Sequence, residues 1–235
     1  MIRHTASIYV VGIGFRPLDG RTRDIVLGSD VILASPRLSE VFRGYEEFRD
    51  VEGRIIVLNG IDETMAYITA ELSSGQDVTI TLLAAGDPLF HGIGRRAIEE
   101  FGKERVEILP DLSSVQVAFA RVRESWDDAF LMSLHGGPDP LKRRRLPYQL
   151  EDIPPLLAKY RKIAILTDST NNPSAIAEEL LKNPPESGHV SVIMSVCERL
   201  GYADERIVED SPEGISPRTF SEPNVVILRY REPSL

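Results

Sequence analysis

The chain has 235 residues, of which 42% are hydrophobic, so its length permits one large domain or two modest ones. Its formal net charge of −9 argues against nucleic-acid binding across the whole surface but is compatible with a local basic pocket. A single cysteine, Cys197, excludes an internal disulfide framework and a cysteine-rich metal site. The first residues lack a signal pattern and no run of about 18 apolar residues occurs, so we expect a cytoplasmic protein without membrane spans.

Short strands and helices alternate in the prediction for the first 112 residues. The strands are short apolar runs rich in β-branched residues. They are expected at residues 7–12, 31–34, 54–58, 78–82 and 106–109. Helices are expected over 61–72, followed by a glycine C-cap, over 93–101, and from Pro36 onward. This alternation predicts a mainly parallel sheet with helices on its faces.

A loop of small residues follows the fourth predicted strand. Side-chain bulk disappears at Ala84, Ala85 and Gly86, and small residues at a strand end let a ligand approach the backbone closely. Asp87 can accept from backbone N–H groups, and Pro88 suits the first turn of a helix. Ligands usually bind at the carboxyl ends of parallel strands, so we interpret this loop as a binding site. The alternative interpretation is an ordinary strand-to-helix turn.

The glycines after the first strand resemble part of a dinucleotide-binding pattern. Gly12 and Gly14 fit it, but the third glycine would fall at Pro17, which cannot give the same close helix packing. The next strand, 31–34, also has no acidic residue at its far end to hold a ribose. We therefore reject a nicotinamide site here.

Polar residues follow two further predicted strands. Ser113 and Ser114 precede a helix expected over 115–122, and either could cap it or hold the polar end of a ligand. Arg37 falls in the first turn of the helix that Pro36 opens. Its guanidinium is either a solvated surface charge or a cation that faces an acidic ligand.

A second set of elements is predicted after residue 112, which gives two lobes, 1–112 and 113–235. Strands are expected at 129–133, 163–166, 190–196, 206–209 and 225–229, and a helix from Asn172 onward. Residues 138–155 are predicted to be a solvated loop with basic residues. Short connections near the end predict an antiparallel portion. With no flexible linker, the lobes are expected to pack together around a cleft.

Nine stretches of the chain match one protein family together. They lie at 11–14, 34–38, 86–90, 110–116, 126–129, 133–136, 166–168, 197–201 and 220–224. On these residues the chain resembles the S-adenosylmethionine-dependent tetrapyrrole methylases of cobalamin and sirohaem synthesis. The Ser-Leu-His-Gly run at 133–136 and the Cys-Glu-Arg-Leu-Gly run at 197–201 are most similar to those of stand-alone C(5)-methylases, which act on precorrin-6Y or cobalt-precorrin-7.

The resemblance implies a two-lobed α/β fold, with a mainly parallel N-terminal sheet and a mixed C-terminal sheet, in a homodimer. It implies that S-adenosyl-L-methionine binds between the lobes and leaves as S-adenosyl-L-homocysteine. By position, the donor would contact Phe15, Ala84, Ala85, Gly86, Asp87, Phe90, Ser113, Ser114, Leu166, Thr167, Met194 and Ser195.

The acceptor implied by the resemblance is an acidic tetrapyrrole. Local cations should bind its carboxylates, and the candidates are Arg16, Arg37, Lys142 and Arg143. His135 could contact the macrocycle or take up a proton, although a structural histidine is an equal alternative. No protein-bound metal, nucleic acid or membrane is expected. Relatives that also methylate C(15) carry an extra domain, for which this length leaves no room, so a separate C(15)-methylase/decarboxylase is expected.

Three departures from the family pattern accompany the resemblance. Gly14-Phe15-Arg16 stands where the family commonly has Gly-Pro-Gly, and Asp111 replaces the usual glycine before the serines. A positive φ would cost more at Asp111 than at glycine. The segment 138–155 is longer than expected. Alternative functions are methylation of another ring position, an RNA base or a protein side chain, or a non-catalytic ligand-binding dimer.

Overall fold

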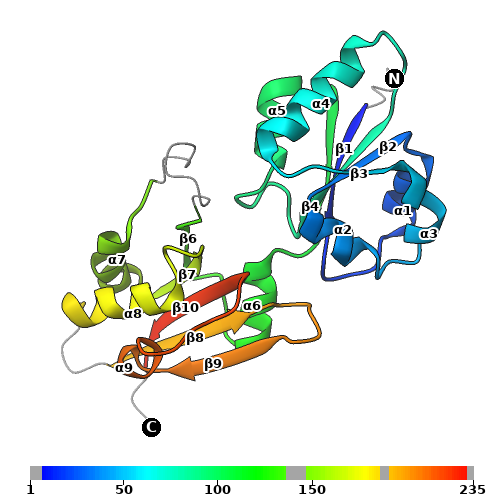
Figure 1. Cartoon of the computed structure of the whole chain (residues 1–235). Coiled ribbons are helices and arrows are strands. Elements are labelled where there is room, and N and C mark those ends of the chain that lie inside the picture. Colours follow the sequence, from blue (N-terminus) through cyan, green and yellow to red (C-terminus); the bar gives the residue numbers. More distant parts are fainter. Residues whose placement is uncertain (1–6, 136–146, 186–190, 232–235) are drawn as a thin grey trace. The chain divides into compact units, whose positions relative to one another are not determined.

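The computed structural model describes residues 7–135, 147–185 and 191–231. The chain divides into two compact units, Met1–Ser113 and Ser114–Leu235. Each unit contains a five-stranded sheet with helices packed on it (Figure 1). The α/β class, the parallel first sheet and the mixed second sheet predicted from the sequence are confirmed.

The first sheet consists of parallel strands in the order β3-β2-β4-β1-β5. Their bounds are β1 Ile8–Ile13, β2 Val31–Ala34, β3 Ile55–Val57, β4 Ile80–Ala85 and β5 Val106–Leu109. The central strands are buried on both faces, which is why they read as continuous apolar runs.

Helices cover both faces of this sheet (Figure 1). The helices on one face are α1 Gly20–Gly28, α2 Pro36–Phe42 and the short α3 Phe48–Val51. Those on the other face are α4 Ile61–Ser73 and α5 Gly94–Phe101. The connection from β1 runs through α1 toward β2, whereas that from β4 runs through α5 toward β5. The neighbouring carboxyl ends of β1 and β4 therefore form the topological switch point, where open α/β sheets usually bind ligands.

The second sheet has the order β6-β7-β10-β8-β9. Its strands are β6 Phe130–Ser133, β7 Lys162–Leu166, β8 Val192–Glu198, β9 Arg206–Asp210 and β10 Asn224–Tyr230. β6 and β7 are parallel, while β10 runs antiparallel to β7 and β8, and β9 antiparallel to β8.

Within the described part of the second unit, four α-helices flank the sheet. Its main core lies against α7 Ile153–Tyr160, α8 Pro173–Lys182 and α9 Pro212–Ile215. α6 Ser114–Val122 contacts β10. Asn172 caps α8 by accepting from the Ala175 N–H at 3.0 Å, as its sequence context predicts.

Several helices were absent from the sequence prediction. α1 carries two glycines and three charged residues in nine positions, so it has little apolar periodicity. α7 falls partly within the predicted loop 138–155, and that part of the prediction is wrong. Tertiary packing buries Ile153, Pro154 and Leu157 of α7 against the second core.

Candidate functional site

Three loops are joined by backbone hydrogen bonds at the carboxyl edge of the first sheet. The Gly86 N–H, after β4, donates to the carbonyl of Ile13, at the end of β1, at 2.9 Å. The Asp111 N–H, after β5, donates to the carbonyl of Gly86 at 3.2 Å. The loops after β1, β4 and β5 therefore form one continuous backbone structure at the switch point.

Two glycines allow these loops to approach each other. Gly86 has φ +57°, and a Cβ there would lie 2.6 Å from the carbonyl oxygen of Leu112 and 3.4 Å from the Cα of Ser113. A Cβ at Gly12 would lie 1.9 Å from the carbonyl oxygen of Gly86. Both positions need glycine because neighbouring backbone occupies the space of a side chain.

The room left by Gly86 is used by the protein itself, which revises the expectation that it admits a ligand. Besides the backbone of Leu112, the Phe15 ring lies 3.5 Å from the position of a Gly86 Cβ. The small side chains on either side differ, because Ala84 is buried and Ala85 is exposed. The open small-residue surface at the end of β4 is therefore that of Ala85.

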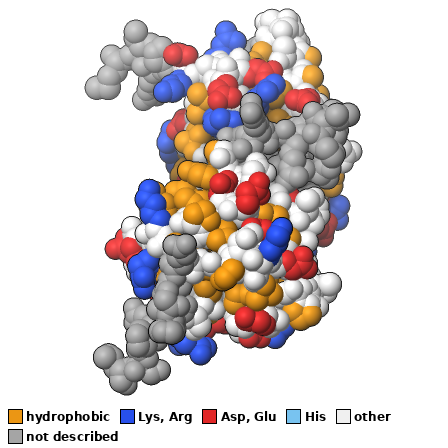
Figure 2. Space-filling view, turned by 90° about the vertical axis from the view of Figure 1, so that its left-hand side faces the viewer, with side chains coloured by type: hydrophobic (Ala, Val, Ile, Leu, Met, Phe, Trp, Pro, Cys, Tyr) orange, Lys and Arg blue, Asp and Glu red, His pale blue; other side chains and the backbone are white. Residues whose placement is uncertain are grey.

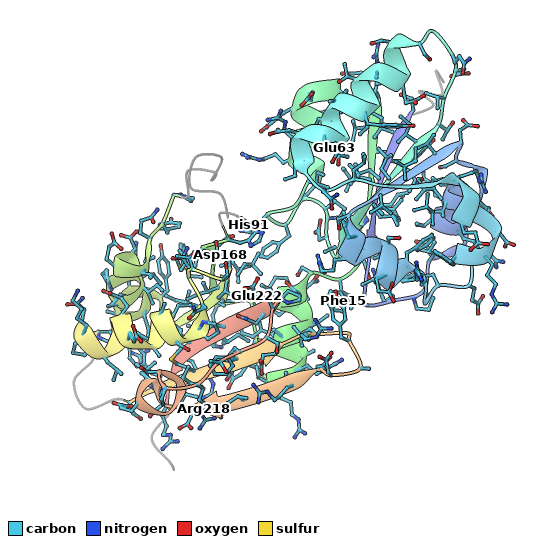
Figure 3. All side chains as sticks on the ribbon, in the orientation of Figure 1. Phe15, Glu63, His91, Asp168, Arg218 and Glu222 are labelled. Carbon is cyan, nitrogen blue, oxygen red and sulfur yellow. The ribbon has the colours of Figure 1, made fainter. Side chains whose placement is uncertain are left out.

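The segment after Gly86 is a compact turn. The Asp87 carboxylate accepts from the Leu89 N–H at 2.8 Å, and the Asp87 carbonyl accepts from the Phe90 N–H at 3.1 Å. The Phe90 ring packs edge-on against His91, with centroids 5.0 Å apart. Figure 3 shows His91 on this loop. The predicted role of Asp87 as a backbone acceptor is confirmed.

The helix after this turn begins where its apolar spacing predicts. α5 starts at Gly94, within one residue of the predicted range 93–101, rather than at Pro88, which suited a first helical turn. His91 adopts φ +56°, a left-handed conformation that interrupts a helix. The carbonyl of Pro88 accepts from the Gly94 N–H at 2.9 Å, so Pro88 belongs to the turn.

Asp111 fastens the loop after β1 to the loop after β5. One carboxylate oxygen accepts from the N–H of Phe15 at 2.8 Å and from that of Arg16 at 3.2 Å. The other accepts from the Leu112 N–H and from Arg16 Nε, both at 2.7 Å. The Asp111 side chain is only 4% exposed, so four donors surround a nearly buried carboxylate.

Two of the sequence departures are therefore in direct contact. Asp111 is absent from the described residues with positive φ, so the expected backbone cost at this position does not arise. Instead its carboxylate binds the Phe15-Arg16 segment, which stands where the family commonly has Pro-Gly. Gly14 is held by another side chain, since its N–H donates to the Tyr45 hydroxyl at 2.7 Å. Burial raises the pKa of Tyr45, which keeps this acceptor neutral.

Three more candidates, Ser113, Arg37 and Arg16, lie in the first unit, and Ser114 begins the second. Ser113 is buried, and Ser114 is the first residue of α6. Arg37 is exposed in the first turn of α2. Arg16 is half exposed, and its Nε is used by Asp111. The sequence reasoning identified Arg16 as a substrate contact and missed this ion pair.

In the second unit, Leu166 and Thr167 lie at the carboxyl end of β7. Leu166 is level with Val225 of β10, which is level in turn with Cys197 of β8. The Thr167 hydroxyl donates to the Asn224 carbonyl at 2.9 Å and is buried. Asp168 and Glu222 flank these strand ends (Figure 3). Leu166 is thus the more open member of the predicted pair.

Met194 and Ser195 lie farther inside the sheet than Leu166. The fully buried Met194 side chain packs in the second core. Ser195 is also fully buried, and its hydroxyl donates to Glu209 at 2.8 Å. The structure therefore does not bring their side chains to the strand end that carries Leu166.

The other candidates of the second unit lie around the end of β6. His135 is exposed, and its N–H donates to the Ser133 hydroxyl at 3.2 Å. Lys142 and Arg143 lie outside the described residues.

The Cys-Glu-Arg-Leu-Gly stretch has a structural role in this unit. Cys197 is fully buried, so the prediction of a packed cysteine is confirmed. The buried Glu198 carboxylate accepts from the Ser221 N–H at 2.6 Å and pairs with Arg206. Arg199 adopts φ +48°, and its N–H donates to the Pro223 carbonyl at 2.8 Å. The stretch joins β8 to the segment that precedes β10.

Neither a metal site nor, on the face shown in Figure 2, a strongly basic patch is found among the described residues. Within residues 7–135, 147–185 and 191–231, no group of three or more His, Cys, Asp or Glu side chains could hold a metal ion. On the face shown in Figure 2, the described acidic and basic side chains are interspersed. In the same ranges, no helix is long and apolar enough to cross a membrane.

The chain is similar in sequence to two proteins named as C(5)-methyltransferases. The chain is 36% identical over 136 residues to the cobalt-precorrin-7 C(5)-methyltransferase of Salmonella typhimurium, covering 58% of this chain and 59% of that protein. It is 28% identical over 229 residues to the probable cobalt-precorrin-7 C(5)-methyltransferase of Methanocaldococcus jannaschii, covering 96% and 99%. The match thus spans less than two thirds of the Salmonella relative.

A solved structure has the same fold. The uroporphyrin-III C-methyltransferase of Thermus thermophilus, complexed with S-adenosyl homocysteine, gives a TM-score of 0.66 at 18% identity and covers 95% of this chain and 92% of that one. A sequence model of the tetrapyrrole (corrin/porphyrin) methylases matches residues 7–214. The chain therefore belongs to the tetrapyrrole methylase family.

Proposed function

We propose that this protein transfers a methyl group from S-adenosyl-L-methionine to C(5) of a corrin precursor, precorrin-6Y or cobalt-precorrin-7, in cobalamin biosynthesis. The observation that carries the proposal is the joined set of loops at the switch point of the first sheet. Its ligand class comes from the relatives, two of which are named as C(5)-methyltransferases, and from the Thermus enzyme complexed with the demethylated donor.

The donor site is proposed on the carboxyl edge of the first sheet. Exposed Ala85 lets a ligand approach the end of β4, and Phe15 and Phe90 offer aromatic surface for an adenine ring. The hydroxyls of the two serines at 113–114 are proposed to provide polar contacts, while the N–H and carbonyl of Gly86 are already hydrogen-bonded to Ile13 and Asp111. The residues at this edge therefore fit a nucleoside ligand.

The second unit would complete the site with the strand end at Leu166 and Thr167. The backbone there is the available contact, because the Thr167 hydroxyl already donates to Asn224. Met194 and Ser195 remain in the proposal only as members of the neighbouring strand, since their side chains are buried in the sheet. Binding between lobes 1–112 and 113–235 is part of the proposal.

The proposed reaction needs little acid–base catalysis by groups of the protein. When bound, the sulfonium donor supplies an electrophilic methyl carbon to an electron-rich ring carbon of the acceptor. The chain's own task is alignment, because holding two reactants about 3–3.5 Å apart can supply roughly 7–11 kcal/mol of the barrier. His135 is a candidate to take up the released proton, since it is exposed at the end of β6.

The acceptor's carboxylates require cations in a chain whose net charge is −9. Arg37 is proposed to contribute one, and Lys142 and Arg143 others. Arg16 is paired with Asp111, so only the exposed part of its side chain is available to a carboxylate of the acceptor. We further propose a homodimer in the cytoplasm that works alongside a separate C(15)-methylase/decarboxylase, as the family resemblance implies.

Calorimetry with S-adenosyl-L-homocysteine tests the donor site. Folded protein should bind it, and failure to bind either this nucleoside or the methyl donor would refute the assignment. Incubation with an isotope-labelled donor and the corrin precursor should then add one methyl group, located at C(5) by NMR. Labelling at another ring position, of RNA or of protein would select one of the alternative acceptors.

A further inference from the structure

We propose that Asp111 is a positioning residue for the methyl donor and that it acts through Phe15. This inference rests on the proposed donor site. It concerns a residue that contacts none of the reacting groups itself. Its carboxylate instead sets the conformation of the loop after β1.

The contacts of Asp111 span two loops that are distant in sequence. Asp111 and Phe15 are 96 residues apart, yet the carboxylate accepts from the Phe15 N–H at 2.8 Å. It also accepts from the N–H of Leu112 at 2.7 Å, so the same group fixes the loop after β5. A nearly buried carboxylate that accepts from four donors, one of them the Arg16 guanidinium, is a strong restraint, because charge-assisted hydrogen bonds are stronger than neutral ones.

The restraint places an aromatic ring at the end of β4. Phe15 projects from the loop after β1 (Figure 3), and its ring edge lies 3.5 Å from where a Gly86 Cβ would be. Phe15 follows Gly14, which has φ +128°, a conformation that side-chain-bearing residues rarely adopt. Without the carboxylate, the N–H groups of Phe15 and Arg16 lose their acceptor, and the ring loses its fixed position.

Arg16 completes the arrangement on the solvent side. Its Nε donates to Asp111 at 2.7 Å, while its side chain is 55% exposed. An ion pair whose cation is this exposed contributes little by itself, even though the carboxylate is nearly buried. The backbone N–H groups therefore account for most of the restraint, and substitution of Arg16 should matter less than substitution of Asp111.

The variant Asp111→Asn tests the inference, since it keeps the shape of the side chain and removes its charge. We expect the Kd for S-adenosyl-L-homocysteine to rise about 10-fold, as loss of a charge-assisted contact implies. The KM for the methyl donor should rise in parallel, while the KM for the acceptor stays unchanged. A structural defect alone would lower the active fraction without this selective change.

A double-mutant cycle asks whether Asp111 acts through Phe15. In the background Phe15→Ala, the additional effect of Asp111→Asn on the Kd should fall below about 2-fold, because contacting residues are not additive. An undiminished effect in that background would overturn the mechanism. Hydrogen exchange gives a readout without ligand, since the amides of Phe15 and Arg16 should exchange at least about 10-fold faster in Asp111→Ala, which removes both acceptor oxygens.

Asp30→Asn is the matched control. Asp30 also accepts a backbone N–H, from Thr79 at 2.9 Å, but it lies at the opposite edge of the same sheet. This variant should leave both the Kd and the exchange of the Phe15 amide unchanged. If wild-type protein binds the nucleoside and Asp111→Asn binds it equally well, only this inference fails. If wild-type protein does not bind it, the proposed function fails, and unchanged amide exchange would independently refute the restraint.

Discussion

The substitution Gly86→Ala should destabilise the first unit and disrupt the proposed donor site. Gly86 has φ +57°, and a left-handed conformation costs a side-chain-bearing residue about 1–2 kcal/mol. Its new Cβ would also lie 2.6 Å from the carbonyl oxygen of Leu112, a backbone atom that cannot rotate away. Relieving such overpacking costs a further ~1–3 kcal/mol.

The matched control is Gly75→Ala. Gly75 has φ +76°, but a Cβ there would meet nothing within 4 Å, so this variant should lose only the conformational term. For a unit of this length, ~1 kcal/mol lowers Tm by about 4 °C. We expect Tm to fall by about 8–20 °C in Gly86→Ala and by about 4–8 °C in Gly75→Ala, measured by differential scanning calorimetry.

Measuring ligand binding in the same two variants distinguishes an effect on the donor site from an effect on stability. At a temperature where both are folded, Gly86→Ala should weaken S-adenosyl-L-homocysteine binding by at least about 10-fold, because the Leu112 backbone must move. Gly75→Ala should bind like wild type. Equal Tm losses together with unchanged binding in Gly86→Ala would refute the close packing that we describe.

Three further predictions concern other positions. Gly12→Ala should be more damaging than Gly86→Ala, since its Cβ would lie 1.9 Å from the Gly86 carbonyl oxygen; a soluble variant with wild-type Tm would contradict this. Glu198→Gln should lower the free energy of unfolding by about 1–3 kcal/mol in urea titrations, because the buried side chain loses its charge toward Arg206. An unchanged urea midpoint would contradict a stabilising role for this ion pair. Burial raises the pKa of Cys197 to about 12 from an ordinary value of 9.0, so the thiol should react with a disulfide reagent at neutral pH only after unfolding. Because the folded pKa is the higher one, this contribution to stability is present below pH 9.0 and is lost as the pH rises toward about 12, which pH-dependent unfolding can measure.

Local sequence patterns predicted most of the secondary structure, and the family resemblance predicted the two-lobed fold. Short β-branched runs located all ten strands to within a few residues, because strand formation there follows local apolar composition. α1 was missed because it has little apolar periodicity, although Asp19 caps it. α7 was missed because its prolines, Pro154 and Pro155, indicate a loop as readily as a helix start. The apolar spacing over 93–101 located α5, whereas Pro88 does not open it, because the turn through His91 depends on packing.

Some features of the candidate site were likewise predictable from the sequence, and others were not. The sequence located the loop around Gly86 and the serines at 113–114, since glycine and capping residues have local meanings. It assigned Arg16 to the substrate, whereas the structure pairs it with Asp111. It also selected Ser195, whose buried hydroxyl serves Glu209, because strand register cannot be read from composition alone.

By itself, the sequence determined the α/β class, the two sheets and the small-residue loop after the fourth strand. These features follow from periodicity and from residue types that act within a few positions of themselves. Only the tertiary structure decided the strand order that creates the switch point, and which groups fill the space beside Gly86. It alone revealed that Asp111 and Phe15, 96 residues apart, are hydrogen-bonded, because such contacts depend on how whole elements pack.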